Sequence, residues 1–124
     1  MEIDLPEVVA EVRTEFERYE QALVSNDVVT LNSLFHDDVR TIRYGGAENL
    51  YGYAAIESFR AARSPAGLPR TLSKTVITTY GRDIAVASTL FARPSAPGQN
   101  RPADADLGEV YRRLARGRRA CQRY

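Results

Sequence analysis

The sequence predicts a single α+β domain in which helices pack on one face of a curved antiparallel sheet. Two observations lead to this fold class: helical patterns dominate the first half of the chain, and a long antiparallel hairpin follows them. The chain has 124 residues, enough for one domain with a substantial core. Helices on one face of a curved sheet leave space between the two layers, so we expect a ligand-binding pocket there.

The first predicted helix runs from Leu5 to Ser25. Asp4 and Glu7 stand three residues apart, which predicts a capping box at its start. Apolar residues then recur at spacings of three and four, as in a helix with one buried face. These residues are Val8, Val12, Phe16, Tyr19 and Leu23.

Two shorter helices are predicted after the first. Ser25-Asn26-Asp27 breaks the apolar pattern and can cap a short helix that extends to Phe35. The other short helix covers Tyr53–Arg63, after a segment rich in glycine. Both carry apolar residues at helical spacing, so both are expected to pack against the rest of the domain.

Between these two helices, a short strand is predicted over Arg40–Tyr44. Its alternation places Thr41 and Arg43 on one face and Ile42 and Tyr44 on the other. An arginine inside a strand with apolar neighbours is unusual, because a buried guanidinium keeps its charge and needs an anion.

Two long strands, Thr71–Tyr80 and Ile84–Arg93, are predicted next. The turn Gly81-Arg82-Asp83 joins them, which is a good signal for a β-hairpin. The second strand consists almost entirely of apolar or small residues, so we expect both of its faces to be covered.

The charge of the chain changes after Arg93. Residues 1–93 carry ten Lys and Arg against thirteen Asp and Glu, whereas residues 94–124 carry seven Arg against three acidic residues. We therefore divide the chain into an α+β domain, residues 1–93, and an atypical basic tail, residues 94–124. The tail lacks the alternation of a strand and can instead form a basic helix.

Composition excludes several function classes. One cysteine, Cys121, and one histidine, His36, rule out a disulfide framework, a thiolate zinc site and a two-histidine metal site within the chain. The net charge of +1 gives no reason to expect nucleic-acid binding. No apolar run is long enough for a membrane span and no export signal begins the sequence, so we expect a cytoplasmic protein.

Arg43 and Tyr19 are the strongest candidate functional residues. Arg43 can hold a substrate carboxylate through two parallel hydrogen bonds, or it can be a surface or ion-paired arginine, with Glu48 as one partner. Tyr19 can be a core tyrosine, or its phenol beside a guanidinium can act as an acid or base.

Four further residues are candidates for substrate binding. Asn49 and Tyr51 lie in the predicted loop after Arg43, where a plain turn explains them equally well. Arg60 and Arg63 lie about one helical turn apart, which usually marks a solvated face but also suits a second anion contact. The cluster from His36 to Asp38 is a weak metal signal, and helix capping explains it better.

The stretches FERYEQALVSNDVVTLNSLF and TIRYGGAENLYGYAAIESFRAAR resemble a small family in the SnoaL-like branch of the nuclear-transport-factor-2-like superfamily. Its members are bacterial proteins encoded beside amidases of cyanuric acid and oxalurate breakdown. The resemblance spans residues 7–93 and implies a cone-shaped sheet wrapped by helices. It also implies a homodimer with a functional link to an amidase-signature enzyme.

For activity, the resemblance implies an amidohydrolase that converts 1,3-dicarboxyurea to allophanate without a metal or other cofactor. Tyr19 and Arg43 are then the catalytic pair, with Tyr19 projecting from the first helix and Arg43 from the first strand. The substrate is a small carboxylated urea, and neither nucleic acid nor a membrane is an expected partner.

The tail departs from this family. Members continue with two strands that contain stretches similar to GRQSQTW and GWR…AAH, whereas this chain has PGQNRPADADLGEVYRRLARGRRACQRY. We hypothesise a frameshift near Gly98 that leaves the C-terminal strands altered or missing. Sequencing of the 3′ end of the gene tests this, and an in-frame read of the present tail would refute it.

Two other functions stay open at this stage. The protein can be a non-catalytic binding or accessory protein for a neighbouring amidase, which would show no turnover alone but would change the rate of its partner. It can also isomerise or dehydrate an organic acid, because a fold of this kind does not fix the reaction.

Overall fold

A computed structural model describes residues 1–45, 48–93, 109–114 and 118–123. The order of the elements is α1 (Pro6–Val24), α2 (Val28–Leu34), β1 (Ile42–Tyr44), β2 (Asn49–Tyr51), α3 (Tyr53–Ala62), β3 (Thr71–Tyr80), β4 (Ile84–Ala92), β5 (Glu109–Leu114) and β6 (Arg118–Arg123). The last four strands form one antiparallel sheet in the order β3-β4-β5-β6, and β1 pairs with β2 in a separate hairpin. The expected α+β fold class is therefore confirmed.

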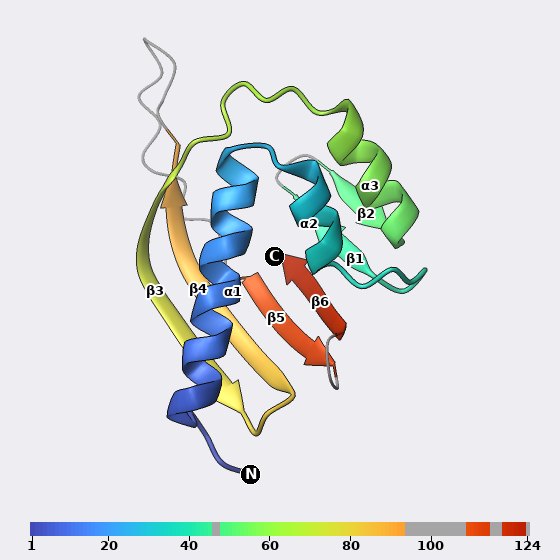
Figure 1. The fold of residues 1–124 in the computed structure, drawn as a ribbon. Coiled ribbons are helices and arrows are strands. Elements are labelled where there is room, and N and C mark those ends of the chain that lie inside the picture. Colours follow the sequence, from blue (N-terminus) through green and yellow to red (C-terminus); the bar gives the residue numbers. More distant parts are fainter. Residues whose placement is uncertain (46–47, 94–108, 115–117, 124) are drawn as a thin grey trace.

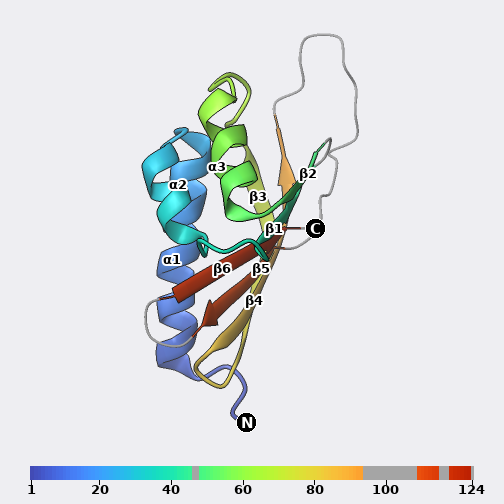
Figure 2. The same cartoon turned by 90° about the vertical axis from the view of Figure 1, so that its right-hand side faces the viewer.

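The three helices form a layer against the strands. Figure 1 shows α1 crossing one face of the sheet, with β3 and β4 bending past it. Helix α1 contacts both α2 and β3, and α3 contacts the β1–β2 hairpin. Strand β1 in turn contacts β6, so the hairpin lies beside the far edge of the larger sheet (Figure 2).

The apolar stripe predicted on α1 faces the core. Its members Val8, Val12, Phe16, Tyr19 and Leu23 are all buried, and Ala22 is buried beside them. They pack in one cluster with residues of α2, α3 and the β3–β4 hairpin, among them Leu31, Ile56 and Ile77. Burial of this stripe holds α1 on the sheet, at about 1.5–3 kcal/mol for each large side chain.

The start of α1 differs from the prediction. The capping box is wrong, because Leu5 is the N-cap residue and no side chain caps the helix. Asp4 instead binds the end of β3: its carboxylate accepts a hydrogen bond from the backbone N–H of Thr79 at 2.9 Å. The next helix follows the prediction, since Asp27 Oδ1 accepts from the backbone N–H of Thr30.

Two further predictions need correction. The segment after Arg43 is not a loop, because Asn49–Tyr51 forms β2 and pairs antiparallel with β1. Strands β5 and β6 follow β4, so a basic helix over these residues is wrong and the C-terminal strands are not missing. Gly98, where we place the frameshift, lies outside the described residues, and the frameshift stays a prediction.

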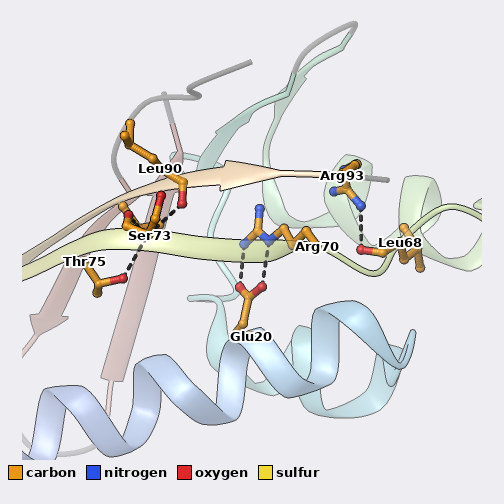
Figure 3. A network of polar contacts seen from close by, with 8 residues as sticks. Glu20, Leu68, Arg70, Ser73, Thr75, Leu90 and Arg93 are labelled. Atoms are coloured by element: carbon orange, nitrogen blue, oxygen red, sulfur yellow. Dashed lines mark hydrogen bonds and ion pairs between the residues drawn. The ribbon is translucent and has the colours of Figure 1, made fainter. Parts of the chain in front are cut away.

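A largely buried ion pair joins α1 to Arg70, the residue that precedes β3. Nε and Nη2 of Arg70 donate to the two carboxylate oxygens of Glu20 at 2.7 and 2.6 Å (Figure 3). The Arg70 guanidinium also lies over the ring of Phe91, 4.6 Å from its centre. Arg93 lies over the same ring and donates to the backbone oxygen of Leu68. This network ties the helix, both long strands and the preceding loop together.

Replacing Glu20 with Ala is expected to lower the free energy of unfolding by about 3–5 kcal/mol, because it leaves the buried Arg70 charge without this carboxylate. Glu17, which is exposed on the same helix, provides the control: Glu17→Ala should stay within about 0.5 kcal/mol. Urea unfolding followed by circular dichroism measures both. Equal stabilities of the two variants would contradict a structural role for the Glu20–Arg70 pair.

Candidate active site

Arg43 points into the protein from the middle of β1. Alternation along the strand buries Thr41 and Arg43, whereas Ile42 and Tyr44 are half-buried. Only 3% of the Arg43 surface is exposed. The sequence left open whether Arg43 is a surface arginine, and the structure buries it, so a full positive charge lies under the surface beside the helices.

The buried guanidinium has two described contacts. Its Nη1 donates to Glu48 Oε1 at 3.0 Å, across the hairpin turn. Its Cζ lies 5.5 Å from the centre of the Phe59 ring on α3, within range of a cation–π interaction. Among the residues that the structure describes, its Nε has no hydrogen-bond partner although it is buried. The Nε–H of Arg43 is therefore a buried donor that an anion could satisfy.

Tyr19 and Arg60 lie together at a second aromatic ring. Tyr19, on α1, is fully buried, and its ring centre is 6.3 Å from that of Phe35. Arg60, on α3, is also fully buried and stacks its guanidinium 4.1 Å above the same Phe35 ring. Phe35 is the C-cap residue of α2. The end of this helix therefore provides the ring that both the Tyr19 phenol and the Arg60 guanidinium contact.

Helix α3 connects these two groups of residues. Phe59 contacts Arg43 and its neighbour Arg60 contacts Phe35, so a single turn of α3 touches both. Tyr19 and Arg60 thus share the Phe35 ring, and Arg43 lies at the Phe59 ring on the same turn of α3. Such an arrangement can bind a small anion and move a proton beside it.

The other predicted binding residues lie apart from this group. Asn49 and Tyr51 are exposed, and they pair with Tyr44 and Ile42, on the opposite face of the hairpin from Arg43. Arg63 is the C-cap residue of α3 and donates to the side chain of Asn26, in the turn between α1 and α2. Of the four, only Arg60 lies with Tyr19 and Phe35.

The cluster from His36 to Asp38 is a local ion pair. Asp38 accepts two side-chain hydrogen bonds from Arg40, and these hold the pKa of its carboxyl well below the usual range. His36 Nε2 lies 3.7 Å from the same carboxylate. Within the described ranges, no group of three or more His, Cys, Asp or Glu side chains is placed to hold a metal ion.

Within the same ranges, no helix is both long and apolar enough to cross a membrane.

Sequence reasoning missed the roles of Phe35 and Phe59, whereas an ion pair of Arg43 with Glu48 was one of its alternatives and is confirmed. The two rings each lie against a buried guanidinium, and aromatic residues beside arginines at helical spacing were the available signal. Glu48 was considered only as a partner that would make Arg43 structural. Its position five residues after Arg43, across a Gly-Gly turn, was the signal for a hairpin contact.

The fold is that of the NTF2-like proteins. One solved NTF2-like protein of unknown function, from Pseudomonas putida, matches with a TM-score of 0.61 at 21% identity, covering 90% of this chain and 80% of that one. More narrowly, the chain belongs to the AtzH-like family, whose sequence pattern matches residues 1–112.

Two solved structures are similar over nearly the whole chain. A protein of unknown function from Pectobacterium atrosepticum is 43% identical, with a TM-score of 0.81 and coverage of 97% of this chain and 91% of that one. A cystatin-like fold protein from Burkholderia xenovorans is 33% identical, with a TM-score of 0.80 and coverage of 99% and 96%. A search of curated proteins gives no match.

Proposed function

We propose that this protein is an amidohydrolase that converts 1,3-dicarboxyurea to allophanate, a step in the breakdown of cyanuric acid. The observation that carries the proposal is the buried Arg43 guanidinium, whose Nε has no hydrogen-bond partner among the described residues. Membership of the AtzH-like family supports it, because the family name and the residues around Arg43 both connect the chain to cyanuric acid breakdown.

The substrate suits the charges of this site. 1,3-Dicarboxyurea is small and planar, and it carries a carboxylate at each end. In the proposed complex, Arg43 holds one carboxylate through two parallel hydrogen bonds and fixes the plane of the molecule. The positive charge of Arg60, on the neighbouring turn of α3, favours a doubly negative ligand over a neutral one.

The reaction breaks the bond between a urea nitrogen and a terminal carboxyl carbon. Water attacks that carbon, the nitrogen takes a proton, and the products are allophanate and bicarbonate. Tyr19 is proposed to move the proton, either from the attacking water or to the leaving nitrogen. A positioned acid or base contributes about 10²–10⁴-fold, a modest demand for a carbamate bond that is already labile.

The experiment is turnover of 1,3-dicarboxyurea by the purified chain, with allophanate hydrolase added so that allophanate is converted to ammonia. The same mixture without the chain gives the background, which matters because the substrate decomposes by itself. We expect ammonia release that rises in proportion to the concentration of the chain. A folded chain, verified by circular dichroism, that gives only the background rate would refute the proposed activity.

A further inference from the structure

We propose that Glu48 is a positioning residue for Arg43: it holds one end of the guanidinium so that the other edge faces the substrate carboxylate. This inference rests on the proposed function and adds to it a residue and an orientation. It is carried by three features of the β1–β2 hairpin: the contact of Glu48 with Nη1, the open Nε of Arg43, and the space that Gly45 leaves for the Glu48 carboxylate.

The contact of Glu48 selects which edge of Arg43 stays available. A guanidinium is planar and offers its donors along edges, one of which is formed by Nε and Nη2. Glu48 Oε1 accepts from Nη1 at 3.0 Å, so it engages a donor outside that edge. Phe59 covers a face of the same group, with its ring centre 5.5 Å from Cζ. Together these contacts restrain rotation of the guanidinium in the absence of a ligand.

The Nε of Arg43, left without a partner, has a cost that a bound carboxylate would offset. Only 3% of the Arg43 surface is exposed, and its Nε has no hydrogen-bond partner in the described part of the chain. A buried donor left without an acceptor costs about 1–3 kcal/mol. A carboxylate that binds to the edge formed by Nε and Nη2 accepts two parallel hydrogen bonds and offsets that cost. In the free protein, this unpaired donor therefore raises the free energy, and its pairing with a ligand carboxylate contributes to binding.

Gly45 makes the position of Glu48 possible. A Cβ at residue 45 would overlap Oε1 and Cδ of Glu48, so any larger residue would displace the carboxylate. The backbone N–H of Gly45 also donates to the backbone oxygen of Glu48 at 2.7 Å, which closes the hairpin turn. Changing Gly45 therefore moves the Glu48 side chain without removing its charge, and this provides a matched test.

Turnover of 1,3-dicarboxyurea is measured for Glu48→Ala, Glu48→Gln, Gly45→Ala and the double variant. We expect Glu48→Ala and Gly45→Ala each to lower kcat/KM by about 10–30-fold, chiefly through a higher KM, as expected when one charge-assisted hydrogen bond is misaligned. Glu48→Gln keeps an acceptor for Nη1 and should stay within about threefold of the parent. The double variant should be no worse than either single change, because both act through the same carboxylate.

A binding measurement makes the test independent of turnover. Malonate, a small dicarboxylate, is titrated while the Nε–H signal of Arg43 is followed by NMR, with Arg43→Lys used to assign that signal. We expect the signal of the parent protein to move on binding, and Glu48→Ala to need about ten times more malonate. Thermal melts show whether each variant is folded.

The outcomes of these experiments distinguish the positioning role of Glu48 from the proposed reaction. Malonate binding that weakens in Glu48→Ala, without any turnover by the parent, would support the role of Glu48 and refute the proposed reaction. A lower KM or tighter malonate binding in Glu48→Ala would mean that Glu48 competes with the ligand, which overturns the positioning role. Unchanged binding in Gly45→Ala, or additive losses in the double variant, would overturn it as well.

Discussion

Replacing Arg43 with Ala is expected to lower kcat/KM for 1,3-dicarboxyurea by about 10²–10³-fold. Two charge-assisted hydrogen bonds to the substrate carboxylate are lost, at about 1.5–3 kcal/mol each before partial compensation by water. The fold should be retained, because the Glu48 side chain that loses its partner is 25% exposed and can be hydrated. Steady-state kinetics with the ammonia-coupled assay measures the loss.

The control for this variant is Arg13→Ala, which removes the same charge from an exposed position on α1 and should leave the rate unchanged. Arg43→Lys adds a second comparison: it keeps the charge but not the planar fork, and it should recover only part of the activity. Near-normal turnover by Arg43→Ala would remove the carboxylate clamp from the mechanism.

Replacing Tyr19 with Phe is expected to lower kcat by about 10²–10⁴-fold with little change in KM, because the variant loses only the proton-transferring hydroxyl. The ring stays, so its packing against Phe35 and the core is kept. Single-turnover and steady-state measurements separate the chemical step from substrate binding.

Tyr80→Phe is the matched control, since it removes a hydroxyl from an exposed tyrosine at the end of β3. It should behave as the parent protein in both assays. A folded and fully active Tyr19→Phe would exclude the acid–base role and would leave Arg43 as a binding group only.

Local patterns were sufficient to predict the parts of the fold that rest on neighbouring residues. The spacing of apolar residues located the first two helices to within a residue or two, and the segment Ser25-Asn26-Asp27 was correctly expected to contain the cap of the second. Alternation along β1 correctly placed Arg43 on the same face as Thr41. These features depend on periods of two and 3.6 residues, which a single sequence displays directly.

Features that depend on distant contacts were not predictable. Asn49–Tyr51 is a strand only because β1 lies beside it, and three residues carry no alternation to detect. Asp4 binds Thr79, 75 residues away, instead of capping the adjacent helix. The burial of Arg60 follows from the Phe35 ring, which a different helix brings to it. A surface position is the ordinary expectation for an arginine, and only tertiary packing overrides it.

The sequence separation of the two buried ion pairs has a consequence for hydrogen exchange. The contact between Arg43 and Glu48 closes over five residues within one hairpin, whereas that between Arg70 and Glu20 spans 50 residues and joins a helix to the sheet. Brief local opening of the hairpin breaks the first pair, while the second breaks when α1 leaves the sheet. Amides around Arg43 and Glu48 should therefore exchange in a cooperative unit of their own, faster than those of α1 and the larger sheet.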